Sequence, residues 1–196
     1  MNKIFYLMGK SASGKDTIFR HLQEDGEFSF QTVVPYTTRP IRTGEVDGED
    51  YFFTDEADLE KIRQEGKLIE LRTYQTAHGP WNYFTVDDGQ FDLAQSSYLM
   101  IGTLESYRSL RAYFGGTRLV PIFIDLDDGL RLQRALDRER AQEAPKYKEM
   151  CRRYLADLED FTEEKIAEAA IDIRFYNNDL MECIDQIKAY IRKNME

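Results

Sequence analysis

The residues with the clearest chemical potential lie near the N-terminus, where the run G-K-S-A-S-G-K occupies positions 9–15. It directly follows the apolar run I-F-Y-L-M at positions 4–8, which is typical of a buried parallel strand. Glycines let backbone N–H groups curl around phosphate oxygens, the following helix presents its positive N-terminus, and Lys15 adds a point charge. Together these features predict a P-loop that binds a nucleoside triphosphate.

The residues just after this lysine depart from the usual P-loop. Asp16 stands where Ser or Thr normally ligates magnesium, and Thr17 provides the nearest hydroxyl. Thr17 is therefore a candidate phosphate contact, while Asp16 could equally support the metal or repel the nucleotide. We expect Mg²⁺ at Asp16 or Thr17, and we assign to triphosphate binding Gly9, Ser11, Ala12, Ser13, Gly14, Lys15, Asp16 and Thr17.

Composition limits the remaining function classes. The chain has 196 residues, enough for one α/β unit with mobile subdomains, and a formal net charge of -10, which argues against a general nucleic-acid surface. No apolar run approaches the roughly 20 residues that cross a bilayer, and the apolar start is too short for a signal peptide, so we expect a cytoplasmic protein. The two cysteines form neither a zinc pattern nor a disulfide framework.

Hydrophobic periodicity predicts alternating strands and helices. Strands are expected over 4–8, 31–35, 98–101, 119–126 and 171–176, and helices over 15–24, 104–113, 128–140, 148–169 and 180–192. This order predicts an α/β fold whose parallel sheet is flanked by helices and binds ligands at the carboxyl ends of its strands. A single domain is expected, with its core in 1–35, 91–130 and 154–196, an acceptor-binding insertion in 36–90 and a lid in 131–153.

The insertion begins with a second phosphate-binding pattern. In T-T-R-P-I-R-T-G-E-V-D-G-E-D-Y-F-F at positions 37–53, Arg39 and Arg42 can clamp an anion and Tyr51 adds a hydroxyl. This segment closely resembles the T-T-R-x-x-R-x-G-E-x-x-G-x-D-Y-x-F signature of guanylate kinases, at every fixed position. The resemblance covers essentially the whole chain and implies the P-loop NTPase fold.

The resemblance implies an acceptor site for GMP. Arg39, Arg42 and Tyr51 would hold its phosphate, and Glu70, which ends the run G-K-L-I-E, would accept the adjacent N1–H and N2–H₂ donors of guanine. The segment A-H-G-P-W-N-Y-F-T at positions 77–85 resembles the family's G-N-x-Y-G-T/S. The implied acceptor set is Arg39, Arg42, Tyr51, Glu70, Tyr83, Thr85 and Thr103.

Three positions depart from the family pattern. Phe84 replaces a glycine, and Pro35 stands where a serine contributes to guanine recognition. At positions 101–103 the family's D-x-D is replaced by I-G-T, which leaves the hydroxyl of Thr103 in place of a carboxylate. These changes concern guanine recognition and metal handling.

An arginine-rich segment at 131–153 follows the second part of the core. Arginines on a closing flap can neutralise charge on a transferred phosphoryl group and exclude water. By resemblance, Arg138 and Arg152 are the lid arginines, with Arg140 as an alternative to Arg138, and Asn177 of the N-N-D run lies near adenine.

The sequence therefore predicts ATP-dependent phosphorylation of GMP, and of dGMP, by direct in-line transfer with Mg²⁺. The predicted catalytic residues are Lys15, Arg39, Arg138 and Arg152. Two alternatives stay open: a kinase of the same fold acting on another phosphorylated acceptor such as ribose 1,5-bisphosphate, and a non-catalytic module that binds a phosphopeptide. We expect a monomer or homodimer with no nucleic-acid polymer and no membrane as partner.

Overall fold

Strand β1 (Ile4–Met8) occupies an inner position of a parallel sheet, and all five of its residues are buried. The computed structural model describes residues 1–76 and 79–196. Within them the sheet has the order β6-β1-β7-β8, formed by β6 (Tyr98–Gly102), β7 (Leu119–Asp125) and β8 (Arg174–Tyr176) beside β1. Each neighbouring pair is parallel, as the apolar run at the N-terminus predicted.

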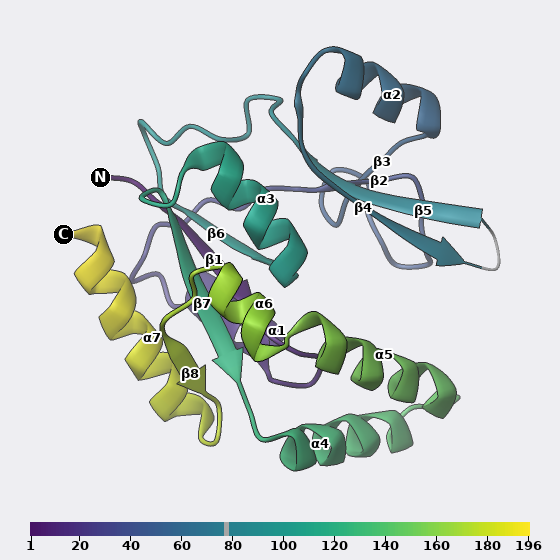
Figure 1. Ribbon diagram of the computed structural model, residues 1–196, viewed down its shortest axis with the longest axis vertical. Coiled ribbons are helices and arrows are strands. Elements are labelled where there is room, and N and C mark those ends of the chain that lie inside the picture. The colour runs from purple at the N-terminus through teal and green to yellow at the C-terminus, as the bar shows by residue number, and fades with distance from the viewer. Residues whose placement is uncertain (77–78) are drawn as a thin grey trace.

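Helices cover both faces of this sheet because successive residues of a strand point to opposite sides. Ile4, Tyr6 and Met8 pack with the side of α3 (Leu104–Phe114) and α6 (Glu163–Glu168), whereas Phe5 and Leu7 pack with α1 (Lys15–Glu24) and α7 (Leu180–Met195). Figure 1 shows these layers, with α3 and α7 on opposite sides of the strands. The P-loop follows β1 and is therefore carried on the most buried strand of the molecule.

A second four-stranded sheet lies within the insertion and is named the small sheet after this small inserted region. In the described residues its order is β3-β2-β5-β4, with the strands β2 (Tyr36–Thr37), β3 (Phe52–Phe53), β4 (Leu68–Thr76) and β5 (Gly79–Val86). Leu59 of helix α2 (Glu56–Gln64) packs with Phe84 and Val86 on one face of the β4–β5 hairpin. The opposite face of the hairpin is consequently left for polar side chains.

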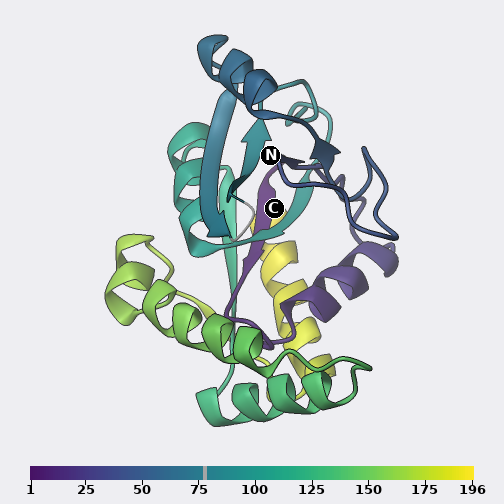
Figure 2. The ribbon, with the colours of Figure 1, turned by 90° about the vertical axis from the view of Figure 1, so that its right-hand side faces the viewer.

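Helices α4 (Asp128–Arg140) and α5 (Tyr147–Asp160) form a pair that projects from the core. Figures 1 and 2 place this pair and the small sheet toward opposite ends of the molecule, and Figure 1 shows both on the same side of the parallel sheet. The segment that joins α4 to α5 contains Pro145, where the sequence predicted a break.

Two predicted elements differ from the structure. The expected strand over 31–35 is irregular apart from a bridge between Gln31 and Tyr98, because the chain leaves the first sheet there and pairs at β2 in the second. The expected helix over 148–169 is interrupted after Asp160, where Thr162 caps a new helix with its hydroxyl. The strand expected over 171–176 is shortened to β8.

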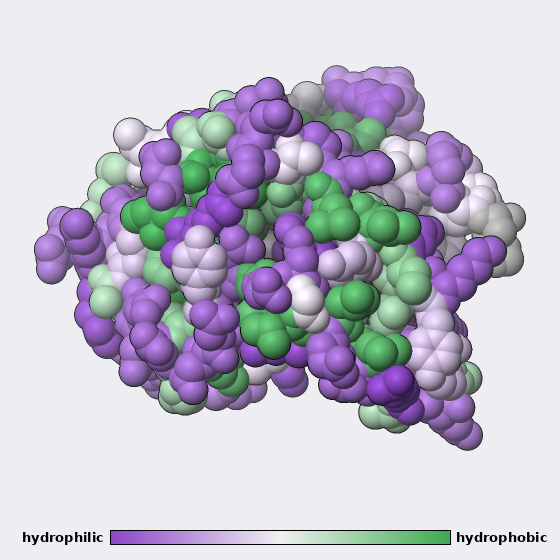
Figure 3. All heavy atoms as spheres, turned by 60° about the horizontal axis from the view of Figure 1, so that its bottom comes forward, coloured by the Kyte–Doolittle hydropathy of each residue, from purple (hydrophilic) through white to green (hydrophobic). Residues whose placement is uncertain are grey.

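The face of the molecule seen in Figure 3 is mostly hydrophilic. Figure 3 views the face that includes α4, where apolar groups are interspersed among polar ones, and exposed apolar side chains of α4 and α5 include Leu130, Leu132, Leu155 and Leu158. Scattered apolar atoms are ordinary on protein surfaces. Among residues 1–76 and 79–196, no helix is long and apolar enough to cross a membrane.

Candidate functional site

The loop after β1 has the backbone of an anion cradle. Gly14 has φ of 92°, a left-handed conformation that suits glycine, and a Cβ at Gly9 would overlap the carbonyl oxygen of Ile124. Ala12 adopts φ of 65°, which is uncommon for a residue with a side chain and is associated with functional loops. The two glycines thus meet steric requirements of the loop that larger residues would not.

Helix α1 begins at Lys15 without a side-chain cap, since Gly14 has no side chain to accept its first N–H groups. The helices α2, α3, α4, α6 and α7, by contrast, each have an Asp or Thr cap that accepts a backbone N–H. The hydroxyl of Ser13 is buried and has no partner within the described part of the chain. Unpaired donors at a helix N-terminus suit a phosphate group.

A cavity of about 670 Å³ opens beside this loop. Lys15 and Asp16 line it and form an ion pair of 3.4 Å, with 19% and 75% of their side chains exposed. The carboxylate of Asp16 thus lies in solvent at the mouth of the cavity, and Thr17 in the next position is only partly exposed.

Asn177 supports the loop from behind. Its side-chain amide donates to the carbonyl of Ser13 at 2.8 Å, and Arg134 donates to the Asn177 carbonyl at 3.1 Å. Asn177 is buried, and a Cβ at Gly14 would overlap its amide nitrogen. In this structure, the side chain predicted to lie near adenine contacts the P-loop backbone.

The base of the α4–α5 pair is also joined to the P-loop. Lys10 contacts Asp128 at 3.1 Å, and the carboxylate of Asp157 accepts from the backbone N–H of Ser11 at 2.8 Å. The buried Arg131 bridges both carboxylates at 3.0 and 3.1 Å and lies 4.1 Å from the ring centre of Tyr154. Hydrogen bonds from Lys10 and Arg131 outweigh the effect of burial and lower the pKa of Asp128.

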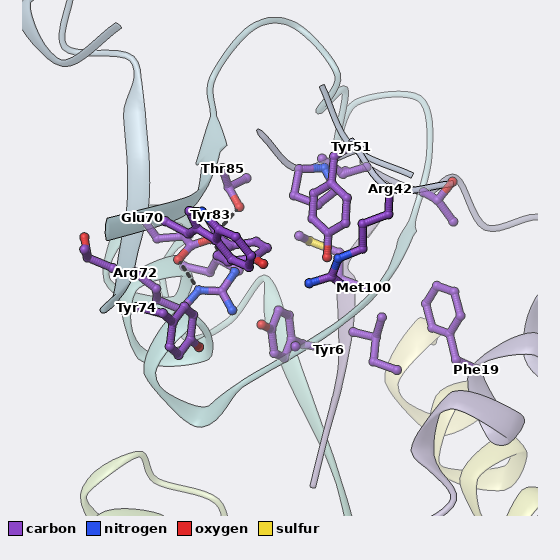
Figure 4. A pocket seen from close by; sticks show the side chains of 18 of the residues that line it. Tyr6, Phe19, Arg42, Tyr51, Glu70, Arg72, Tyr74, Tyr83, Thr85 and Met100 are labelled. Carbon is purple, nitrogen blue, oxygen red and sulfur yellow. Dashed lines mark hydrogen bonds and ion pairs between the residues drawn. The ribbon is translucent and has the colours of Figure 1, made fainter. Parts of the chain in front are cut away.

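A larger cavity, of about 870 Å³, lies between the small sheet and the parallel sheet. Figure 4 shows Arg42, Tyr51 and the side chains of the β4–β5 hairpin arranged around it. The two cavities share Tyr74, Ile101 and Gly102 in their walls, so they adjoin. The carboxyl end of β6 therefore lies between the P-loop cavity and the second one.

The two arginines of the 37–53 motif have different surroundings. Arg42 lines the larger cavity, with its guanidinium carbon 5.9 Å from the ring centre of Trp81. Arg39 is buried behind the wall, where Glu45 accepts from both of its terminal nitrogens at 2.7 and 2.6 Å and the Tyr51 ring centre lies 5.0 Å away. Arg42 and Tyr51 can therefore reach a ligand in the cavity directly, whereas Arg39 supports Tyr51 and the loop.

Glu70 and Arg72 lie two residues apart on β4, so both face the cavity. Arg72 donates to the two Glu70 oxygens at 3.0 and 3.3 Å, and the hydroxyl of Thr85, opposite on β5, donates at 2.9 Å. Burial opposes the charged form of Arg72, but the Glu70 carboxylate outweighs it and raises the pKa of the guanidinium. Tyr83 lies opposite Arg72 and lines the same cavity.

Thr103 is placed on the P-loop side of the boundary. It lines the smaller cavity and caps α3, where its hydroxyl accepts from the Ser106 backbone N–H at 3.2 Å. The hydroxyl of Ser106 is also bonded to that of Tyr6, which is buried over Gly102. Burial raises the pKa of Tyr6 far above its usual value.

The predicted lid arginines are also separated. Arg152 lines the larger cavity and is paired with Glu149 at 2.7 Å, whereas Arg138 lines a small hollow with Arg131 and Arg153. Arg140, the alternative to Arg138, is exposed and lies 3.9 Å from Asp137. His78 lies outside the described residues.

The sequence profile described as guanylate kinase matches residues 1–194. The chain belongs to the guanylate kinase family. Its α/β architecture also matches that of a guanylate kinase from Anaplasma phagocytophilum, with a TM-score of 0.66 and 21% identity over 100% of this chain and 87% of that one. This similarity shows the P-loop NTPase fold.

Curated guanylate kinases match either a short segment closely or the whole chain more distantly. The protein of Streptococcus pneumoniae is 42% identical over 66 residues, covering 34% of this chain and 32% of its own length. That of Oceanobacillus iheyensis is 37% identical over 91 residues, or 44% of each chain. The alignments with these two relatives thus span about a third to under half of their length. The protein of Zymomonas mobilis is 29% identical over 202 aligned positions, covering 94% of this chain and 81% of its own.

Four residues near the guanylate kinase-like site were absent from the sequence-based site assignment: Tyr6, Arg72, Asp128 and Asp157. The alternation of β4 was the available signal for Arg72, because residues 70 and 72 of one strand must share a face. The contacts of Asp128 and Asp157 with the P-loop join positions more than 100 residues apart, and no local pattern indicates them.

Proposed function

We propose that this protein transfers the γ-phosphoryl group of ATP directly to the phosphate of GMP, and of dGMP, giving ADP and the nucleoside diphosphate. The observation that carries the proposal is the junction of two cavities, one at a P-loop and the other lined by Arg42, Tyr51 and Glu70. Phosphoryl transfer depends mainly on positioning donor and acceptor in line and on neutralising charge.

In the proposed mechanism, the P-loop backbone and Lys15 bind the triphosphate at the N-terminus of α1. Gly9, Ser11, Ala12, Ser13 and Gly14 shape this cradle, and Asn177 holds it at the Ser13 carbonyl. The lid arginines Arg138 and Arg152 would approach the transferred group when α4 and α5 move toward the small sheet. Arg152 already lines the acceptor cavity and would exchange Glu149 for phosphate.

On the acceptor side, Arg42 and Tyr51 would bind the GMP phosphate, with Arg39 fixing Tyr51 from behind and Tyr83 beside it. The Tyr51 and Tyr83 ring centres are 5.7 Å apart, edge to face. Glu70, oriented by Thr85, would accept hydrogen bonds from the guanine base. Thr103 lines the P-loop cavity next to the wall that both cavities share, and from there its hydroxyl would face the acceptor.

The donor set suits Mg²⁺ carried in by ATP. Among the described residues, no group of three or more His, Cys, Asp or Glu could hold a metal. In the proposal the ion is bound largely by nucleotide oxygens and water. Asp16 is exposed at the mouth of the P-loop cavity and is the carboxylate we assign to it, with Thr17 as the neighbouring hydroxyl. When bound, the ion would neutralise phosphate charge.

The proposal is tested by measuring ADP release from Mg-ATP with GMP, dGMP, AMP, UMP, CMP and ribose 1,5-bisphosphate, using Lys15→Ala as the blank. Selective turnover of GMP and dGMP is expected. Turnover of ribose 1,5-bisphosphate alone would overturn the acceptor assignment, and nucleotide binding without turnover of any acceptor would indicate a binding module.

The same proposal includes a cytoplasmic enzyme that acts as a monomer or homodimer, without a nucleic-acid polymer or membrane partner. It also assigns acceptor binding to residues 36–90, the lid to 131–153 and the core to the rest of the chain. Sedimentation at several protein concentrations, with and without both nucleotides, tests the oligomeric state.

A further inference from the structure

Arg72 is the cation in the acceptor cavity to which the proposed mechanism gives no role. Its guanidinium lies between Glu70 and Tyr6 in Figure 4, and only 16% of its side chain is exposed. The hydrogen bonds from Arg72 to Glu70 use the Nε and Nη2 atoms, and Arg72 also lines the cavity. A guanidinium has five N–H donors in a fixed plane, so it has donors beyond those two bonds.

The hydrogen-bonding capacity of Glu70 limits how both residues can bind a base. A carboxylate offers about four lone-pair positions, and Glu70 already accepts two bonds from Arg72 and one from Thr85. About one position is left for a ligand. Guanine presents two neighbouring donor groups, N1–H and N2–H₂, so pairing both with Glu70 requires Arg72 or Thr85 to release at least one bond, and Arg72 supplies two of the three.

The released donor must then find another acceptor close by. The backbone of β4 fixes Arg72 beside Glu70, and leaving a mostly buried guanidinium unpaired is costly. On guanine, O6 is the acceptor next to N1–H. A donor that leaves the Glu70 oxygen used by N1–H therefore has O6 as its neighbour on the base, and pairing of Arg with guanine O6 is geometrically favourable.

Resting on the proposed function, we propose that Arg72 is a specificity-determining residue, which donates to the O6 atom of guanine while Glu70 accepts from N1–H and N2–H₂. The pair thus reads three adjacent groups of one base edge. It also provides a polar contact on a pocket wall where Pro35 has no side-chain donor. Adenine, with an amino group at that position, would face the Arg72 donors unfavourably.

The test compares GMP, 6-thio-GMP and IMP as acceptors for the wild-type protein, Arg72→Gln and Arg72→Lys. The thio analogue keeps both donors but replaces O6 with a weaker acceptor, and IMP keeps O6 but lacks the N2 amino group. For each pair we would measure kcat/KM with Mg-ATP and, separately, Kd by calorimetry without ATP. Arg63→Gln is the matched control, because Arg63 lies on α2 with 53% of its side chain exposed.

In the wild-type protein and in Arg63→Gln, GMP is expected to be preferred over 6-thio-GMP by about 10-fold or more. In Arg72→Gln this preference falls to within about 2-fold, while the preference for GMP over IMP, which depends on Glu70, remains. Arg72→Lys retains charge but not the planar fork, so it is expected to be intermediate. If Arg72→Gln does not fold, the ratio of GMP to 6-thio-GMP activity measured with Arg72→Lys tests the inference instead.

A merely supporting role for Arg72 has a different signature. Loss of Glu70 positioning alone would weaken GMP and 6-thio-GMP by the same factor and leave their ratio unchanged, which would overturn the inference. If the wild-type protein neither binds nor phosphorylates GMP, the proposed function itself fails. Turnover of GMP with an unchanged ratio in the Arg72 variants refutes the role of Arg72 alone.

Discussion

The P-loop cavity and the cavity at the small sheet differ in the groups that they offer to a ligand. At the P-loop, the donors are backbone N–H groups and the uncapped start of α1, with Lys15 as a single added charge. At the small sheet, the groups are side chains that already pair with one another, as Glu70 and Arg72 do in the cavity wall and Arg39 and Glu45 do behind it. The first site is built by chain conformation and the second by side-chain pairing.

This difference has a consequence for how each site can change. In a phosphate site made of backbone N–H groups, few residues can replace the glycines. Substitutions of the neighbouring side chains change its ligand binding little. A site made of paired side chains changes its ligand preference whenever one partner is replaced, because the other partner is then left with an unmet hydrogen-bonding requirement. Acceptor specificity in this chain should therefore be much easier to alter than triphosphate binding.

The largest effect on turnover is expected from removing the Lys15 side chain from the P-loop cavity. Lys15→Ala removes the charge at the outer phosphates and should lower kcat by about 100- to 1,000-fold. Calorimetric affinity for GMP should be unchanged, because Lys15 lines only the P-loop cavity of the two. Lys61→Ala, on α2, is the control with the same charge change and should leave kcat unchanged; equal turnover in both variants would contradict the mechanism.

Arg42→Ala is expected to weaken acceptor binding in the cavity at the small sheet. The loss of one charged hydrogen-bond donor to the acceptor phosphate should raise the KM for GMP by about 10- to 30-fold with a smaller change in kcat. The KM for ATP should stay within about 2-fold. Steady-state kinetics with each substrate varied in turn provide the measurement, and a parallel rise in the KM for ATP would show that the two cavities are not independent.

Gly102 tests the boundary that the two cavities share. A Cβ there would overlap the hydroxyl of Tyr6 and approach Ser106 Oγ to 3.0 Å, so Gly102→Ala should lower the free energy of unfolding by about 1 to 2 kcal/mol. Urea denaturation measures this. Gly116→Ala is the control, because its Cβ would meet the flexible Arg111 side chain at 3.3 Å. Tyr6→Phe combined with Gly102→Ala should recover part of the loss; no recovery would mean that the hydroxyl is not the obstacle.

The smallest effect concerns the pH range over which the Arg39–Glu45 pair stabilises the loop at 37–53. The hydrogen bond that Glu45 accepts from Arg39 lowers the pKa of Glu45 to about 2 from an ordinary value of 4.5. Because the folded-state pKa is the lower one, the stabilisation is fully present above about pH 4.5 and is lost as the pH falls toward 2. Carboxyl NMR, assigned with Glu45→Gln, should show Glu45 ionised at pH 4. A folded-state midpoint near 4.5 would show that the Arg39–Glu45 pair does not persist in solution.

The sequence predicted the P-loop strand and the first helix after it well, because these elements depend on residues that are close together in the chain. The apolar run 4–8 became β1, and the helix expected over 15–24 is α1 with the same bounds. The helix expected over 128–140 also has the observed bounds. The strand expected over 31–35 was wrong, because only Gln31 forms a bridge there and the chain joins the second sheet at β2.

The sequence by itself determined the P-loop, the family signature at 37–53 and the alternation of strands and helices in the parallel-sheet core, but not the strands β2–β5 and the helix α2 of the insertion. Each of these depends on residues that are neighbours along the chain, so spacing and composition suffice. Only the tertiary structure decided that Asp157 contacts the Ser11 N–H and that Asn177 lies behind Gly14. These contacts form when segments distant in sequence pack together, and the geometry of that packing is set by the whole core.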